Sequence, residues 1–225
     1  MTEVDVVANL ESVQKRIRAA ELRGGRQPGS VKLVAVTKKV PVEQITKVLE
    51  AGISDLGENR VQELMAKQEQ LPGANWHLIG HLQTNKVKYV INKTVLIHSL
   101  DRWKLAETIH RLAAAKGLTV DVLVQVNISG EETKYGLSPN EVEDFITEAS
   151  QLSAINIRGL MTMAPYVDNP EEVRPIFKEL YTMRQKLAEK WPHIQLTSMG
   201  MTNDFEVAVE EGADIVRVGS AIFRA

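Results

Sequence analysis

The sequence predicts a parallel (β/α)8 barrel with one extra N-terminal helix, and three observations support this fold class. Short apolar segments of strand length alternate eight times with segments whose apolar residues recur every three or four positions. Strands that alternate with helices pair in parallel through right-handed crossovers. Eight such units in 225 residues fit a closed barrel better than an open doubly wound sheet, and no G-x-G-x-x-G follows the first strand.

The elements can be assigned in chain order. A first helix has Leu10, Val13, Ile17 and Ala20 on its apolar face and ends near the glycines of "RGGRQPG". Eight strand segments follow, and each is short and rich in aliphatic residues. In order they are "KLVAVT", "SDLG", "NWHLI", "TVLIHS", "TVDVLVQVNI", "NIRGLMTM", "IQLTSM" and "DIVRVG".

The helices between these strands begin with recognisable signals. Pro41 stands at the start of the second helix, and Asp101 is a good N-cap for a helix that extends to Lys116. Residues 138–141 form a capping box, and residues 169–172 make a similar start. The other helices are expected from about 59 to 70, from Thr84 or Asn85, from about 203 to 211, and after Gly219.

Composition excludes several classes of protein. The net charge of -2 and the absence of a basic cluster argue against nucleic acid and anionic membranes as partners. The chain has no cysteine, hence no disulfide and no thiolate nucleophile, and no secretory signal or bilayer-length apolar run. We expect one cytoplasmic domain over residues 1–225. His77 and His81 are four apart, but "WHLIGH" reads as a strand and a loop, so no metal site is expected. The sequence assigns no partner to His98, His110 or His193.

Polar residues at strand ends are the candidates for chemistry, because barrels of this type place their working residues there. Arg217 lies inside the last strand, where a charge is costly unless something pairs with it. Gly219 and Ser220 follow it and offer backbone N–H groups to a phosphate, and Ser198 and Thr202 add hydroxyl donors. The alternative is that Gly219 is an ordinary turn residue and the serines cap helices.

The first strand ends in two lysines, in "VKLVAVTKKVP". The simpler reading is that the strand surfaces there and that both side chains face water. If Lys38 instead points into the barrel mouth, low dielectric and a neighbouring arginine favour its neutral amine, which condenses with aldehydes. An amine, a phosphate cradle and a cation on the far side of a ring are the groups needed to hold pyridoxal 5′-phosphate (PLP).

Six segments carry a resemblance to the pyridoxal phosphate homeostasis protein family: "AVTKKVP", "GENRVQE", "WHLIGHLQTNK", "ETKYGL", "RGLMTM" and "SMGMTNDFEVAVEEGADIVRVGSAIF". The similarity extends from about residue 5 to the C-terminus. It implies a single barrel like the N-terminal domain of alanine racemase, the fold type III arrangement, without the second β domain of those enzymes.

The resemblance also implies roles for individual residues. Lys38 matches the Schiff-base lysine, Arg217 matches the arginine beside the pyridine nitrogen, and Asn59 lies near the cofactor. The residues expected at the phosphate are Ser198, Thr202, Gly219 and Ser220. Lys39 has no such match and is expected to face solvent. Thr37 and Thr202 stand where serine is commoner in the family, and both keep a hydroxyl.

The expected function is vitamin B6 homeostasis: binding of PLP with no catalytic residue and little turnover. An arginine at the ring nitrogen favours the unprotonated ring, which is the weaker electron sink. Racemases of this fold also need a second acid or base from another domain or subunit. The partners expected are PLP and apo forms of PLP-dependent enzymes as transient acceptors, with the protein itself a monomer.

Two alternatives stay open. One is a small racemase that uses Lys38 with His77, His81 or Tyr135. The other is a barrel enzyme without PLP whose lysine forms a Schiff base with a phosphorylated substrate. The segment 129–138, which contains Lys134, fits a mobile lid or handover site, and a simple exposed turn fits it equally well.

Overall fold

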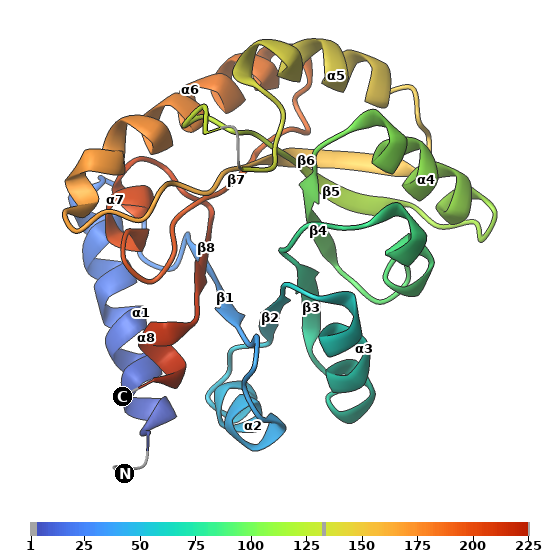
Figure 1. Cartoon of the computed structure of the whole chain (residues 1–225). Helices are drawn as coiled ribbons and strands as arrows, with labels where there is room; N and C mark the ends of the chain where they lie inside the picture. Colours follow the sequence, from blue (N-terminus) through green and yellow to red (C-terminus); the bar gives the residue numbers. More distant parts are fainter. Residues whose placement is uncertain (1–3, 132–133, 225) are drawn as a thin grey trace.

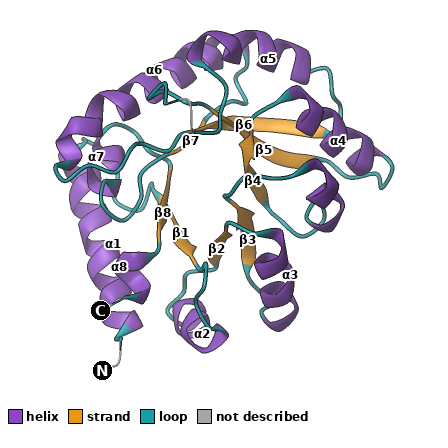
Figure 2. Cartoon of the chain, viewed as in Figure 1, coloured by secondary structure: helices purple, strands orange, loops and turns teal. Residues whose placement is uncertain are grey.

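The barrel that the sequence predicts is confirmed. The computed structural model describes residues 4–131 and 134–224, so Glu132 and Thr133 of the "ETKYGL" segment lie outside the described residues. Eight parallel strands form one closed barrel in chain order, and β8 pairs back with β1 through Val34 and Arg217 (Figure 1). The helices lie outside this ring of strands (Figure 2).

The strands lie close to their expected positions. They are β1 (Lys32–Val36), β2 (Asp55–Glu58), β3 (Asn75–Leu78), β4 (Leu96–Leu100), β5 (Val120–Gln125), β6 (Ile155–Met161), β7 (Leu196–Ser198) and β8 (Ile215–Val218). The α-helices are α1 (Val6–Arg23), α2 (Val42–Glu50), α3 (Val61–Gln70), α4 (Trp103–Ala114), α5 (Val142–Ala149), α6 (Arg174–Lys190), α7 (Phe205–Glu210) and α8 (Ser220–Phe223). Three short 3-10 helices are η1 (Thr84–Tyr89), η2 (Pro139–Glu141) and η3 (Pro170–Val173).

The core has two layers because successive side chains of a strand face opposite sides of the sheet. One set of side chains fills the inside of the barrel; it comprises Val34, Leu96, Leu123, Met161 and Ile215. A much larger set lies between the strands and the surrounding helices. Since both faces of the sheet are buried, the strands are almost continuously apolar, as parallel sheets require.

The extra helix α1 packs against the end of the chain. Its apolar residues Leu10, Val13, Ile17 and Ala20 are buried as expected. They face α7 and α8, so the two termini lie side by side in Figure 1. The helix therefore supports the last βα unit of the barrel.

Two helices differ in detail from the prediction, although the one after β3 begins at Thr84 as expected. The helix after β3 is the 3-10 helix η1, which buries only Val87 of its own residues. This six-residue segment is too short to extend an amphipathic α-helical face. Asp101 does not cap α4: Arg102 holds the N-cap position, and the Asp101 carboxylate instead contacts His81 and Arg102. Tertiary partners thus replace the local cap. The capping box at 138–141 is confirmed.

Among the helices of the described chain, none combines the length and apolar character needed to cross a bilayer.

Candidate functional site

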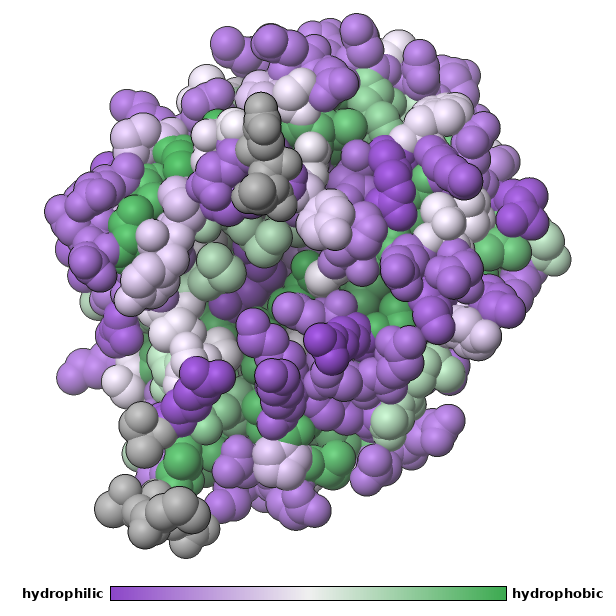
Figure 3. All heavy atoms as spheres, in the orientation of Figure 1, coloured by the Kyte–Doolittle hydropathy of each residue, from purple (hydrophilic) through white to green (hydrophobic). Residues whose placement is uncertain are grey.

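The carboxyl ends of the eight strands converge on one end of the barrel, and the candidate residues follow or end these strands. We call this end the mouth. In the space-filling view, hydrophilic side chains cover most of the face toward the reader, with hydrophobic atoms between them (Figure 3). Parallel pairing around a closed ring is what brings residues from distant parts of the sequence to this end.

Lys38 lies in the turn that follows β1. Val34 faces the barrel interior, and the two-residue period of a strand puts Val36 and then Lys38 on the same side. The Lys38 side chain is exposed, and within the described part of the chain it makes no hydrogen bond or ion pair. Lys39 is exposed, as predicted, and has a positive φ of 59°. One lysine is therefore available to a ligand at the mouth.

Side chains from β2 and α3 hold this turn from below. The Lys67 ammonium donates to the Thr37 carbonyl and to Glu58 Oε1, both at 2.6 Å, and the Thr37 hydroxyl donates to the same carboxylate at 2.7 Å. The Lys39 N–H donates to Glu63 Oε2 at 3.0 Å. Residues 37–39 are thus bonded both before and after Lys38, while Lys38 itself is left free.

Glu58 is the most constrained member of this cluster. Its side chain is fully buried, and burial raises its pKa above the usual range, an effect that the hydrogen bonds from Lys67 and Thr37 partly offset. Its second carboxylate oxygen, Oε2, has no hydrogen-bond partner among the described residues. A buried carboxylate with one unmet oxygen depends on Lys67 for its charge to be tolerated.

Arg217 lies on β8 and faces the barrel interior, because its neighbours Val216 and Val218 belong to the outer core layer. It is 3% exposed. Its guanidinium donates to Ser198 Oγ and, at 2.9 Å, to the Thr162 carbonyl. Burial lowers its pKa to about 10, although the nearby Asp204 opposes this shift. Arg217 therefore stays a cation at neutral pH.

Asp204 is a buried carboxylate in the loop after β7, which sequence reasoning did not single out. Burial raises its pKa, against the hydrogen bond from the Met201 N–H and the charge of Arg217. It is close enough to attract Arg217, yet no hydrogen bond joins the two side chains in the described structure. The guanidinium consequently keeps a largely uncompensated charge near the mouth.

The loops after β7 and β8 approach each other closely. The Thr202 hydroxyl accepts long hydrogen bonds from the N–H groups of Gly219, at 3.3 Å, and Ala221, at 3.4 Å. A Cβ at Gly219 would lie 3.1 Å from the Val36 carbonyl oxygen, and Gly200, at φ +90°, leaves equally little room beside Phe205. A weakly bonded hydroxyl thus lies beside the backbone N–H groups on either side of the exposed Ser220.

Asn59 is placed at the mouth by the turn that follows β2. A Cβ at Gly80 would lie 2.3 Å from the Asn59 carbonyl oxygen, so glycine is required for the β2 and β3 loops to touch. The Asn59 side chain is half-buried and, among the described residues, has no hydrogen-bond partner. It can therefore turn toward a ligand.

The loops after β3, β4 and β5 bring together a separate polar group. His81 Nδ1 lies 3.1 Å from Asp101 Oδ2, and the Tyr135 ring stacks on the His81 ring with centroids 4.0 Å apart. Tyr135 is 56% exposed. This cluster lies in the loops after β3, β4 and β5, whereas Ser198, Thr202 and Arg217 belong to β7 and β8 or their loops.

Two histidines without predicted partners prove to be central. His98 is fully buried and lies 2.9 Å from both His77 and Ser198. His77 also contacts Asp55, so it does not reach the mouth. Their partners are 21 to 100 positions away in sequence, and only the strand alternation in "NWHLI" and "TVLIHS" could have indicated that these rings share the interior.

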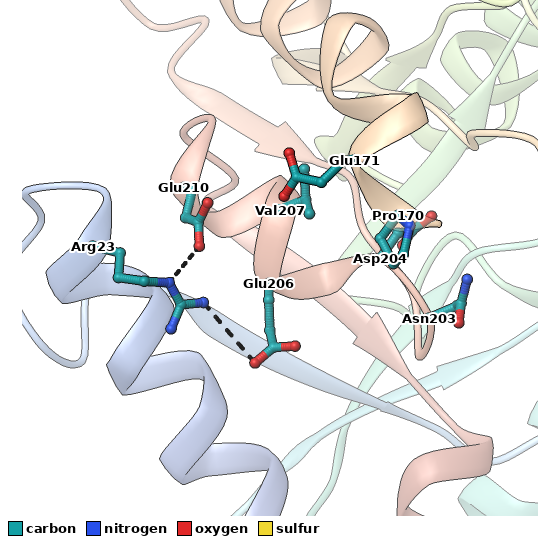
Figure 4. A pocket seen from close by; sticks show the side chains of 8 residues that line it. All are labelled: Arg23, Pro170, Glu171, Asn203, Asp204, Glu206, Val207 and Glu210. Atoms are coloured by element: carbon teal, nitrogen blue, oxygen red, sulfur yellow. Dashed lines mark hydrogen bonds and ion pairs between the residues drawn. The ribbon is translucent and has the colours of Figure 1, made fainter. Parts of the chain in front are cut away.

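A cavity of about 280 Å³ lies away from this site, on the outer side of α7. Figure 4 shows Arg23 pointing at Glu206 and Glu210 across it. Its lining comes from α1, η3, α7 and the loop before α7, and it includes neither Lys38 nor Arg217. Three of the carboxylates here, those of Glu171, Glu206 and Glu210, are paired with arginines. No cluster of three or more metal-ligating side chains occurs in residues 4–131 and 134–224.

Comparison with known proteins gives the same picture along the whole chain. Residues 8–225 match the family described as alanine racemase, N-terminal domain. A pyridoxal phosphate homeostasis protein of Aquifex aeolicus is 46% identical over 220 residues, which cover 95% of each chain. PipY of Synechococcus elongatus, solved with PLP bound, is 34% identical with a TM-score of 0.85, covering 97% of this chain and all of that one.

Alanine racemase itself is a more distant neighbour. The enzyme of Clostridium difficile, solved with cycloserine, is 16% identical with a TM-score of 0.76 and shares the fold alone. This chain covers 57% of that enzyme's chain, against all of PipY. The sequence and the structure together therefore place the chain in the pyridoxal phosphate homeostasis protein family.

Proposed function

We propose that this chain binds PLP at the mouth, with Lys38 forming the covalent Schiff-base link to its aldehyde. The observation that carries the proposal is a pair of basic side chains in opposite environments, one in the turn after β1 and one on the neighbouring strand β8. Lys38 is exposed and, among the described residues, unpartnered, whereas Arg217 is buried and faces the interior. The PLP-bound relative that matches nearly the whole chain supports this choice of ligand.

The spacing of the two cations suits a ring held between them. Arg217 pairs in register with Val34, and Lys38 lies four residues further along β1 and its turn. Four residues of extended chain span up to about 13 Å, which leaves room for an aromatic ring between two long side chains. The Lys38 amine condenses with an aldehyde and releases one water, and the bonded turn at 37–39 holds it in place.

Arg217 influences whether the ring nitrogen of bound PLP carries a proton. PLP supplies an electron sink, which works best when its ring nitrogen is protonated. Arg217 keeps its own proton at neutral pH, since its pKa is about 10. A cation at the ring nitrogen favours the unprotonated ring. We therefore propose a carrier of PLP with little turnover, in which no residue acts catalytically.

The phosphate group is proposed to lie at the loops after β7 and β8. Thr202 and Ser220 offer hydroxyl groups, and Gly219 allows the backbone to come close. The long bonds that Thr202 now accepts are weak enough for an anion to displace. Asn59 borders the site from β2. Ser198 acts from beneath, through Arg217.

The proposed cellular role depends on the accessibility of the Schiff base between PLP and Lys38. A Schiff base on an exposed lysine can be attacked by another amine, so PLP can be released to apo forms of PLP-dependent enzymes. We propose that the protein takes part in vitamin B6 homeostasis in this way, as a cytoplasmic monomer. Light scattering of the purified protein tests the oligomeric state.

An absorption spectrum combined with chemical trapping tests the binding proposal. PLP is added to the wild type, to Lys38→Ala and to the matched control Lys39→Ala, and each is reduced with borohydride. We expect a yellow protein and a trapped adduct on Lys38 in the wild type and the control, and neither in Lys38→Ala. An adduct on another residue, or a colourless wild type, refutes the proposal. A colourless protein that forms an adduct with a phosphorylated carbonyl compound would instead identify an enzyme without PLP.

One observation favours a second candidate, a small racemase. His81, oriented by Asp101 and stacked on Tyr135, is a group at the mouth that could accept a proton. His77 is unsuited to this role because Asp55 and His98 occupy both of its ring nitrogens. Exchange of the α-proton of amino acids in D₂O, faster than with free PLP and lost in His81→Gln, would establish this activity.

A further inference from the structure

A line of polar groups, partly exposed at Asp55 and buried from His77 onward, runs through the apolar interior of the barrel. It consists of Asp55, His77, His98, Ser198 and Arg217, which we call the barrel relay. The His77 Nε2–Asp55 Oδ1, His77 Nδ1–His98 Nε2 and His98 Nδ1–Ser198 Oγ distances are each 2.9 Å. Ser198 Oγ also accepts from Arg217 Nη1.

The relay connects the two ends of the barrel. Asp55 begins β2 and also contacts the Lys32 ammonium at 3.1 Å, at the end opposite the mouth. Ser198 ends β7, and Arg217 lies beneath the mouth. His98 and Ser198 are fully buried and His77 is 2% exposed. In such surroundings hydrogen bonds are strengthened, and an unpaired polar group is costly.

The groups at the two ends of the relay determine which atom donates and which accepts in each hydrogen bond between them. Arg217 can only donate, and Asp55 accepts because hydrogen bonds from His77 and Lys32 lower its pKa despite its burial. Burial, together with the nearby charge of Arg217, lowers the pKa of His98 well below its ordinary value, so His98 is neutral at pH 7. It therefore carries one ring proton, on Nδ1 or on Nε2.

Only one placement of that proton gives the Ser198 hydroxyl an acceptor and lets His77 bond both neighbours with a single ring proton. With the proton on Nε2, His98 donates to His77 Nδ1, His77 donates to Asp55, and the Ser198 hydroxyl donates to His98 Nδ1. With the proton on Nδ1, the Ser198 hydroxyl has no acceptor in the described structure, and a His77 ring with one proton cannot bond both of its neighbours.

We propose that His77 and His98 are positioning residues that direct the Ser198 hydroxyl away from the mouth and thereby hold the Arg217 guanidinium at the ring nitrogen of PLP. This rests on the proposed function for the identity of the ligand, but the geometry of the relay does not depend on it. It assigns Ser198 to Arg217 rather than to the phosphate, because its one hydroxyl hydrogen is committed to His98. Thr202, Gly219 and Ser220 are left to hold the phosphate.

The first test uses the protein freed of PLP, so it is independent of cofactor binding. Long-range ¹⁵N–¹H spectra of the histidine rings distinguish the two tautomers directly. We expect both His77 and His98 to carry a proton on Nε2, with His98 Nδ1 unprotonated. A His98 ring protonated on Nδ1 overturns the proposal. Wild-type protein suffices, so no variant has to fold.

The second test separates hydrogen bonding from packing. His98→Gln keeps one donor and one acceptor, whereas His98→Leu fills the space with carbon, and the exposed His193→Leu is the control. The readouts are proton exchange at the Arg217 guanidinium in the apo protein and the affinity for PLP. We expect His98→Leu to speed exchange and to weaken PLP binding by about tenfold each, since bonds to charged groups are lost or loosened. His98→Gln should stay within about threefold of the wild type.

The outcomes separate this inference from the proposed function. A positioning role for His98 is refuted if the Arg217 guanidinium protons exchange at the same rate in the wild type and in His98→Leu. It is also refuted if His98→Gln and His98→Leu change the exchange rate and the PLP affinity by the same amount. If Arg217 exchange responds as expected but no adduct forms on Lys38, the relay stands and the PLP proposal fails.

Discussion

At the scale of single residues, two buried networks support the site from opposite directions. Lys67 and Glu58 hold the turn that carries Lys38, and the barrel relay holds Arg217. Neither network is needed for a barrel to close, and both place ionisable groups where burial is costly. Changing the charge of a group in either network should therefore alter stability in a way that changing an apolar core residue would not.

Replacing Lys67 with methionine should destabilise the protein by about 3 kcal/mol, because it strands the Glu58 carboxylate in the core. The double variant Lys67→Met/Glu58→Gln removes the stranded charge and should recover most of this loss. Urea unfolding of both single variants and the double variant measures the coupling, with the exposed Lys15→Met as control. A double variant less stable than Lys67→Met would contradict the account.

The buried position of His98 should make the free energy of unfolding depend on pH in a specific way. Its pKa in the folded protein lies well below the ordinary 6.5, so the unfolded chain binds a proton that the folded one does not. The stability it contributes is complete above 6.5 and is lost as the pH falls below that value. At about pH 5.5, one unit lower, the loss is about 1.4 kcal/mol.

Unfolding of the wild type and His98→Gln between pH 7.5 and 5.5 measures this contribution, since the other titrating groups are common to both proteins. The wild type should lose about 1.4 kcal/mol more than the variant. The exposed His193→Gln should behave like the wild type. If His98→Gln and the wild type lose stability in parallel, then His98 is not held neutral.

At the scale of elements, local patterns predict those features that local interactions control. The apolar face of α1 and the capping box before α5 are predictable from sequence because the residues that form each of them are three or four positions apart. Asp101 was misassigned as a cap because His81, from another loop, competes for its carboxylate. The partners of His98 come from other strands, so its role could not be read from neighbours in sequence.

The close approach of β6 and β7 is an element-scale feature with a single-residue cause. The register of β5 and β6 shifts by one residue at Arg158, and Gly159 follows directly. A Cβ on Gly159 would lie 1.8 Å from the Leu196 carbonyl oxygen. Glycine at this position therefore allows β7 to pair and brings Ser198 to the correct depth.

Gly159→Ala should cost about 2–3 kcal/mol, because backbone atoms of β7 must move to relieve the overlap. Gly73→Ala is a matched control, since nothing lies within 4 Å of its Cβ position and its φ is not positive. Thermal and urea unfolding compare the two variants. Equal stability of Gly159→Ala and Gly73→Ala would show that the barrel absorbs the extra methyl group.

At the scale of the whole molecule, the first helix and the last helix are one unit. The Asn9 side chain donates to the Ile222 carbonyl at 3.2 Å and to the Arg224 carbonyl at 3.4 Å, which joins α1 to α8. Arg16 and Arg23 join α1 to Glu206 and Glu210 of α7. The N-terminal segment thus supports the two loops on which the phosphate proposal rests, from outside the barrel.

Asn9→Ala should therefore affect a ligand that it cannot touch. Without its amide, the carbonyl ends of α8 lose a donor, and Ser220 at the other end of this short helix is held less firmly. We expect PLP affinity to fall about threefold and stability to fall by about 1 kcal/mol. Borohydride trapping on Lys38 at saturating PLP should be unchanged, because the turn at 37–39 is held by β2 and α3. Ser12→Ala, on the exposed side of the same helix, is the control. If Asn9→Ala loses stability while its PLP affinity stays the same, then α1 supports the fold alone and the cradle does not depend on it.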